Sequence, residues 1–222
     1  MVASSGKRSA QKGRALPAMK TMKRPARAAA LPLRKKVTFV CAAGAGGGRS
    51  RQMLLRQFGE VHEMSFRGTP NLTTAERETP FLQQIVAAAQ AAAKKSPSRP
   101  LFLVGHSFGA RAAVHLMCRK DLRRQLPRSC QGIIAFGYPL IHPTQKRENK
   151  LMDLPVSTKA LFISGTKDPF SGDFKLFEKT LKKLRCKTRL VKVLGGDHGL
   201  KCARALEEGA VSTINDAVSH FV

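Results

Sequence analysis

The sequence predicts an α/β fold built on a mostly parallel sheet of about six strands, with helices on both faces. From residue 36 onward, short apolar runs alternate with longer helix-like stretches, which is typical of strands and crossover helices in a parallel sheet. The length of 222 residues is enough for one large domain with a substantial core. We therefore expect one domain over residues 37–222, preceded by an arm over residues 1–36.

The arm contains 11 Lys and Arg and no acidic residue, and its prolines interrupt any helix, so we expect it to be disordered. Three interpretations remain open: a mitochondrial presequence, a nuclear-import stretch within residues 23–36, and contact with nucleic acid. No apolar run approaches the roughly 18 residues that span a bilayer, and no apolar secretory core is present. The expectation is an intracellular protein without a transmembrane segment, in the nucleus, cytoplasm or mitochondrion.

The elements of the domain follow in order along the chain. Thr79 and Pro80 form a good N-cap and first-turn pair, which predicts an Ala-rich helix ending near Lys95. Further helices are expected over residues 110–118 and about 202–220. No insertion is evident between residues 132 and 160, so we expect a minimal lid or none. The six predicted strands cover residues 37–41, 61–66, 101–104, 132–136, 160–164 and 189–194.

The strongest local motif is GHSFG at residues 105–109, directly after one predicted strand and before a predicted helix. This G-x-S-x-G pattern in a strand–turn–helix setting is the nucleophile elbow of the α/β-hydrolase fold. The turn is so tight that side chains at Gly105 and Gly109 would collide. It also places the Ser107 hydroxyl at a helix N-terminus, whose N–H groups favour a developing anion. His106 is expected to be structural.

A serine hydroxyl needs a general base, and the base needs a partner that fixes its tautomer. In an α/β-hydrolase these residues follow in the order serine, acid, histidine, each after a later strand. Asp168 follows the strand over residues 160–164, and His198 follows the strand over residues 189–194. The predicted triad is therefore Ser107, Asp168 and His198, with Asp173 and Asp197 as alternative acids.

The oxyanion of the tetrahedral intermediate needs two backbone N–H donors. Phe108, after the nucleophile, can supply one, and Ala45, in the glycine-rich loop after the first strand, can supply the other. A phosphate-binding loop is the rival interpretation of this loop. The segment AGAGGGRS at residues 43–50 departs from that pattern, because Ala43 replaces the first glycine and Arg49 replaces the lysine that reaches the phosphates. We expect no cofactor.

Taken together, the motifs resemble the small α/β-hydrolases of the dienelactone-hydrolase-like group, in the branch of testis-expressed protein 30 and subunit 3 of the NSL chromatin complex. The resemblance rests on AGAGG at residues 43–47, GHSFGAR at 105–111, GYPLIHP at 137–143, LFISGTKDP at 161–169 and DHG at 197–199. It implies the same three site residues. It also marks one departure: Ala43 stands where such proteins often have histidine. The branch includes members that resemble scaffolding subunits.

The charge of the chain is unusual, since 40 Lys and Arg against 14 Asp and Glu give a net charge of +26. Without the arm, 29 basic residues still face 14 acidic ones, a net +15. Such a field favours polyanionic partners, although basicity can also serve solubility alone. The five cysteines show no CxxC pair, which indicates a reducing compartment without disulfides or structural zinc.

Two functions therefore stand side by side. The first is a serine hydrolase, of esterase or thioesterase type, that acts on a small ester or thioester through an acyl-enzyme. The second is a catalytically weak scaffold subunit whose basic arm and surface bind nucleic acid, a ribonucleoprotein or a chromatin assembly. Lys146, Arg147, Lys150, Lys175 and Lys179 could line the approach of an anionic substrate, but a solvated face is the preferred interpretation. The oligomeric state is open.

Overall fold

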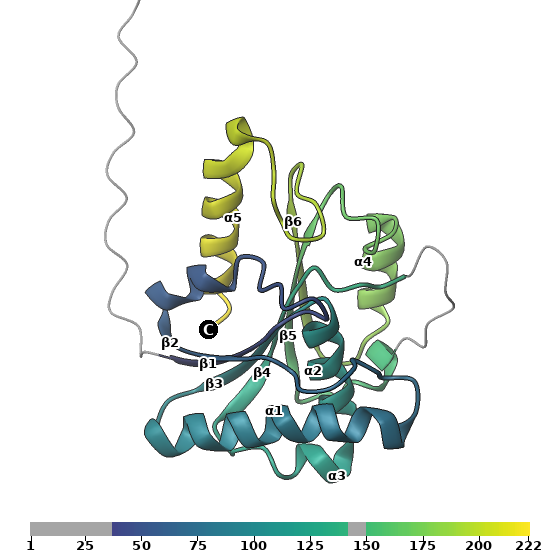
Figure 1. Ribbon diagram of the computed structural model, residues 1–222. Coiled ribbons are helices and arrows are strands. Elements are labelled where there is room, and N and C mark those ends of the chain that lie inside the picture. Colours follow the sequence, from purple (N-terminus) through teal and green to yellow (C-terminus); the bar gives the residue numbers. More distant parts are fainter. Residues whose placement is uncertain (1–36, 142–149) are drawn as a thin grey trace, which may run out of the picture. The chain divides into compact units, whose positions relative to one another are not determined.

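The computed structural model describes residues 37–141 and 150–222, and the predicted arm lies outside them. Its centre is one parallel sheet of six strands in the order β2-β1-β3-β4-β5-β6 (Figure 1). The predicted fold class is confirmed, and every predicted strand is present within two residues of its expected ends. The strands are β1 (Val37–Ala42), β2 (Gly59–Met64), β3 (Leu101–His106), β4 (Cys130–Phe136), β5 (Lys159–Gly165) and β6 (Lys187–Val193).

The strand order reverses once, between β1 and β3. From β1 the chain adds β2 on one side and then returns to add β3 on the other, after which β4, β5 and β6 follow outward. Loops that leave the carboxyl ends of β1 and β3 therefore diverge to opposite faces of the sheet. This is where open α/β sheets form their ligand crevice.

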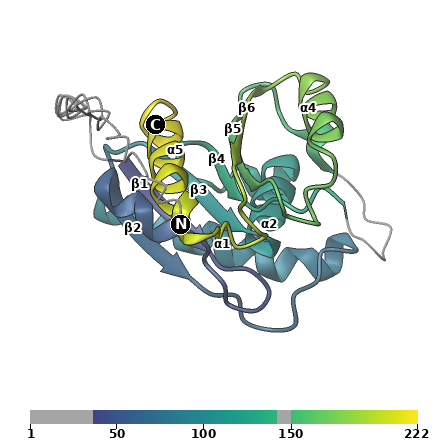
Figure 2. The ribbon, with the colours of Figure 1, turned by 90° about the horizontal axis from the view of Figure 1, so that it is seen from above.

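Helices cover both faces. On one face α1 (Ala75–Lys95), α2 (Phe108–Cys118) and α4 (Phe174–Lys182) bury strand side chains such as Leu103 and Phe162. On the other face α5 (Glu207–Ser219) and the 3-10 helix η1 (Gln52–Gln57) bury Phe102 and Ile163. Figure 2 shows α5 and α4 on opposite sides of β5 and β6. The short elements are α3 (Lys120–Arg123), η2 (Lys150–Asp153) and η3 (Arg204–Leu206).

The start of α1 corrects one prediction. The helix begins at Ala75, and Thr74 is the N-cap, whose hydroxyl accepts a hydrogen bond from the Arg77 N–H at 3.3 Å. Pro80 lies inside the helix rather than at its first turn. The last helix also begins later than expected, at Glu207, because the 3-10 turn η3 precedes it. Local propensity identified these helices, whereas capping and packing set where they begin.

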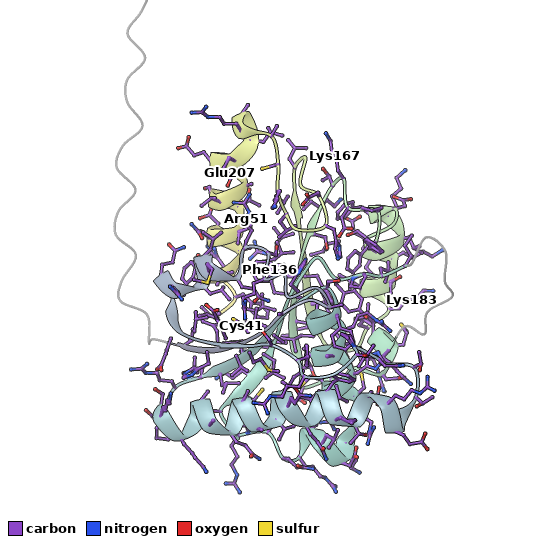
Figure 3. The ribbon with its side chains drawn as sticks, in the orientation of Figure 1. Cys41, Arg51, Phe136, Lys167, Lys183 and Glu207 are labelled. Atoms are coloured by element: carbon purple, nitrogen blue, oxygen red, sulfur yellow. The ribbon has the colours of Figure 1, made fainter. Side chains whose placement is uncertain are left out.

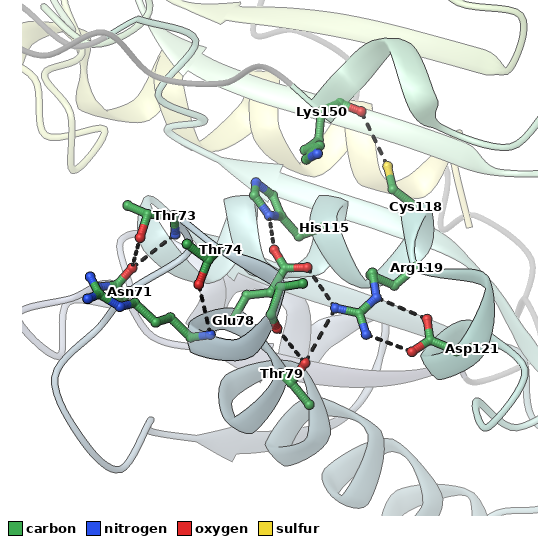
Figure 4. Close-up of polar contacts among 12 residues, drawn as sticks. Asn71, Thr73, Thr74, Glu78, Thr79, His115, Cys118, Arg119, Asp121 and Lys150 are labelled. Atoms are coloured by element: carbon green, nitrogen blue, oxygen red, sulfur yellow. Dashed lines mark hydrogen bonds and ion pairs between the residues drawn. The ribbon is translucent and has the colours of Figure 1, made fainter.

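A buried ion network attaches the first turn of α1 to α2. The Glu78 carboxylate accepts a hydrogen bond from His115 Nδ1 of α2 at 2.7 Å and another from Arg119 at 3.0 Å (Figure 4). Arg119 also pairs with Asp121 at 2.6 Å, which holds the pKa of that carboxyl at about 2. Glu78 and His115 are almost wholly buried. This network fixes the start of α1 against the end of α2.

The cysteines are free thiols. Cys41 lies within the core, and Cys118 is partly buried and packs against the core. Burial raises the pKa of Cys118 to about 12 and that of Cys130 to about 11, so both remain protonated at neutral pH. No helix within residues 37–141 or 150–222 has the length and hydropathy needed to cross a membrane.

Candidate active site

Ser107 occupies a strained turn between β3 and α2. Its φ of 51° and ψ of −109° lie in a region that residues other than glycine rarely adopt. A Cβ on Gly105 would lie 2.2 Å from the Ala110 nitrogen, and one on Gly109 would lie 2.5 Å from the Ala42 oxygen. Both glycines are therefore required by backbone contact, as the motif predicts. The Ser107 N–H donates to the Phe136 carbonyl at 3.1 Å, which holds the turn against β4.

Phe108 fixes the first turn of α2. Its ring packs edge-on against Phe66 at 5.0 Å and against Phe81 at 5.6 Å between centroids. The three rings lock the helix N-terminus to α1 and to the loop after β2. Within the described residues the Phe108 N–H donates no hydrogen bond, so it remains available to an oxyanion beside Ser107.

Asp168 and His198 meet beyond the carboxyl ends of β5 and β6. His198 Nδ1 lies 2.9 Å from Asp168 Oδ2, and the Asp168 side chain is fully buried. The carboxylate also accepts hydrogen bonds from the Phe170 N–H at 2.8 Å and from the Ser171 hydroxyl at 3.1 Å. The Phe170 ring lies against the imidazole, with 4.6 Å between centroids. These contacts fix both the carboxylate and the plane of the imidazole.

The alternative acids have other roles. Asp173 is the N-cap of α4 and accepts from the Lys175 N–H at 2.9 Å. Asp197 accepts from the Lys201 N–H at 2.8 Å, inside its own turn. Among the described residues it is Asp168 whose carboxylate contacts the His198 imidazole. The contacts of Asp168 with Phe170 and Ser171 were not predicted, although the sequence Asp168-Pro-Phe-Ser171 is compatible with an Asx-type turn.

His106 joins the elbow to the two neighbouring loops. Its Nδ1 lies 3.1 Å from the Gly48 carbonyl, and its Nε2 lies 3.1 Å from the His198 carbonyl. Burial lowers the pKa of His106, since the charged imidazole would be poorly solvated there. The side chain is structural, as predicted, and it sets the spacing between the glycine-rich loop, the elbow and the histidine loop. Within the described residues, Ser107 Oγ forms no hydrogen bond with the His198 ring.

The glycine-rich loop over residues 43–50 is closed by its own backbone. Gly44 donates to the Gly48 carbonyl at 2.7 Å, and Gly47 donates to the Gly44 carbonyl at 2.9 Å. Ala45 lies at the exposed tip, and its N–H donates no hydrogen bond within the described residues. Arg49 is engaged by Glu63 at 3.3 Å and by Ser65 at 2.9 Å, so it does not act as a phosphate-loop lysine.

Two residues tie this loop to the histidine loop. The Ser50 hydroxyl donates to the Gly199 carbonyl at 2.8 Å, and Arg51 Nε donates to the Leu200 carbonyl at 3.1 Å. Arg51 also forms a bidentate ion pair with Glu207 at the start of α5 (Figure 3). Beside this ion pair lies a cavity of about 720 Å³ whose lining includes His106, Arg49 and Lys201. Three loops that are far apart in sequence are thus fastened around one crevice.

A family model described as an alpha/beta hydrolase domain matches residues 35–222. The chain belongs to this family. The α/β-hydrolase superposes on an alpha-beta serine hydrolase homologue from Coxiella burnetii with a TM-score of 0.58 and 13% identity, covering 84% of this chain and 85% of that one. It also superposes on the dienelactone hydrolase of Anabaena variabilis with a TM-score of 0.56 and 19% identity, covering 84% and 85% of the two chains.

A third similar structure is a serine hydrolase without a lid from Xanthomonas campestris. Its TM-score is 0.56 at 18% identity, over 86% of this chain and 83% of that one. At such identities the likeness establishes the fold. It agrees with the dienelactone-hydrolase-like group predicted from the motifs, while the resemblance to the branch of testis-expressed protein 30 and the NSL subunit stays a prediction.

Proposed function

We propose that this α/β-hydrolase is a serine hydrolase of the esterase or thioesterase type, with Ser107 as nucleophile, His198 as general base and Asp168 as its orienting acid. The hydrogen bond of 2.9 Å between His198 Nδ1 and Asp168 Oδ2 carries the proposal. It fixes the tautomer in which Nε2 has a free lone pair, which is the form that accepts a proton from a serine hydroxyl.

The reaction would proceed in two balanced halves. Ser107 Oγ attacks the carbonyl carbon of the ester or thioester while its proton passes to His198 Nε2, and the carbonyl oxygen becomes an oxyanion. Collapse of this intermediate breaks the bond to the alcohol or thiol, which leaves with that proton. Water then attacks the acyl-enzyme and gives its proton to His198. Release of the carboxylic acid restores the Ser107 hydroxyl.

The N–H groups of Ala45 and Phe108 are the proposed oxyanion donors. Both are free of hydrogen bonds among the described residues, and they come from the loops after β1 and β3, where the strand order reverses. The hydrogen bond from Ser107 to His198 would form as substrate binds, because such contacts are often loose in the free enzyme. The replacement of a histidine by Ala43 leaves these backbone donors in place.

A fluorophosphonate probe tests this proposal directly. We expect the full chain to be labelled at Ser107, with labelling lost in Ser107→Ala and retained in the matched exposed variant Ser98→Ala. Peptide mapping by mass spectrometry identifies the modified residue. A folded protein that resists the probe, or labelling that survives in Ser107→Ala, would refute the assignment.

The second candidate, a catalytically weak scaffold subunit, predicts a different result in the same assay. A scaffold subunit that has lost catalytic activity would bind its partner, but Ser107 would react with the probe at no higher rate than free serine. The observation that favours a role beyond hydrolysis is the net charge of +15 outside the arm.

A further inference from the structure

A group of 11 of the 29 basic residues in residues 37–222 lies at one edge of the sheet. In a parallel sheet the amino ends of all strands lie at the same edge, opposite the carboxyl ends that carry Ser107, Asp168 and His198. We use "amino edge" for the four segments that lead into β3, β4, β5 and β6. These segments are residues 94–100, 123–131, 155–160 and 182–188.

The amino edge contains 11 Lys and Arg and no Asp or Glu. The loops that leave β5 and β6 at the other edge, residues 166–173 and 194–207, mix three basic with four acidic residues. The amino edge is therefore more strongly positive than the loops after β5 and β6, which uniform basicity for solubility would not produce.

Within residues 37–141 and 150–222, most of these cations form no ion pair. Arg99 pairs with Glu60, and Arg123 donates to the Met117 carbonyl. The remaining nine are exposed, and within the described residues none of them forms an ion pair with a carboxylate. They are Lys94, Lys95, Arg124, Arg128, Lys159, Lys182, Lys183, Arg185 and Lys187.

The centre of the edge holds like charges close together around a groove. A groove of about 480 Å³ is lined by Arg123, Arg128 and Lys159. Lys159 and Lys187 are paired positions at the first residues of the neighbouring strands β5 and β6. Neighbouring like charges destabilise a sheet unless an anion lies between them. The arrangement thus suits a ligand with several negative charges spaced along its length.

We propose that the amino edge binds the phosphate backbone of a double-stranded nucleic acid without reading its sequence. Five of the 11 cations are arginines, whose planar fork matches phosphate oxygens. The four segments contain no Phe, Tyr or Trp. They therefore offer neither the stacking platform that single strands need nor the aromatic anchors typical of membrane-surface binding.

The proposal goes beyond the hydrolase function and does not depend on it.

The test compares two full-length triple variants that each remove three positive charges. The edge variant combines Arg128→Gln, Lys159→Gln and Lys187→Gln. The control variant combines Lys167→Gln, Lys201→Gln and Arg204→Gln, all exposed at the carboxyl edge, where Lys167 is visible in Figure 3. Anisotropy of labelled DNA and RNA duplexes is followed across a salt titration.

We expect the wild type and the control variant to bind with similar, steep salt dependence. In the edge variant the slope of log K against log salt should be shallower by about two to three, and the affinity at ~0.1 M salt should be about 10²-fold lower. Melting by circular dichroism verifies that each variant is folded. Equal losses in the two variants, no duplex binding by the wild type, or tighter edge-dependent binding to phosphatidylserine vesicles would each overturn the proposal.

Discussion

Replacing Glu78 by Gln should destabilise the domain by detaching the first turn of α1 from α2. The substitution keeps the side-chain volume and removes the charge that His115 and Arg119 both face in Figure 4. The glutamine oxygen can still accept from one of these donors, but its NH₂ group then points at the other.

The expected loss follows from the two contacts. Hydrogen bonds to a charged group contribute about 1.5–3 kcal/mol each, and the variant loses about one of them. Because Glu78 is buried and Arg119 keeps its pairing with Asp121, we expect about 2–3 kcal/mol in the free energy of unfolding. For a domain of this size each kcal/mol corresponds to about 2–4 °C, so the melting temperature should fall by about 4–12 °C.

Urea denaturation followed by circular dichroism measures this change. Glu76→Gln is the matched control, because Glu76 lies in the same helical turn but is exposed. It should cost no more than about 1 kcal/mol, the contribution of one charge near a helix N-terminus. A double-mutant cycle with Arg119→Gln should show coupling of about 1 kcal/mol or more. Equal effects of Glu78→Gln and Glu76→Gln would refute the structural role of the network.

Three further predictions concern pH, backbone contact and the triad. Burial lowers the pKa of His115 below its unfolded value of about 6.5, so near this pH the unfolded state binds more protons than the folded state. The free energy of unfolding should therefore decrease as pH falls below about 6.5. In His115→Gln the urea midpoint should depend less steeply on pH than in the wild type. Gly109→Ala should destabilise by at least about 2 kcal/mol because its Cβ meets backbone, whereas Gly209→Ala, with open space in α5, should stabilise by about 0.5–1 kcal/mol in the same denaturation assay. Asp168→Asn should slow probe labelling by about 10³–10⁴-fold, while Asp173→Asn, which removes only a helix cap, should leave the rate within about ten-fold.

The fold could be predicted because its signals are local and repeat along the chain. Apolar runs such as residues 101–104 and 160–164 can be buried only in a sheet that is covered on both faces. The nucleophile elbow is marked by a glycine on either side of Ser107. The residues at which the helices begin could be predicted less well. The burial of Glu78 depends on α2, whose His115 lies 37 residues further along the chain, so the local pair Thr79-Pro80 was misleading.

The candidate site could be predicted only in its residue types and order. Ser107, Asp168 and His198 follow the carboxyl ends of β3, β5 and β6, and a parallel sheet brings such ends to one edge. The hydrogen bonds that connect the loops of the site could not be predicted. The contacts from His106 to the carbonyls of Gly48 and His198 depend on how far each loop extends beyond its strand, and sequence does not specify that reach.

Because the two proposed sites lie at opposite edges of the sheet, we expect probe labelling and duplex binding to be independent of each other. The contacts around Ser107 involve loops beyond the carboxyl ends, while the proposed phosphate contacts involve residues before the amino ends. The strands between them pair in one continuous parallel sheet. Ser107→Ala should therefore bind duplexes like the wild type, and the edge variant should react with the probe like the wild type. Loss of both properties in either variant would mean that the two edges are energetically coupled, which a rigid sheet between separate loop sets does not provide. Independence of the two would instead describe a hydrolase whose charged edge holds it on a polyanion while the opposite edge stays open to substrate.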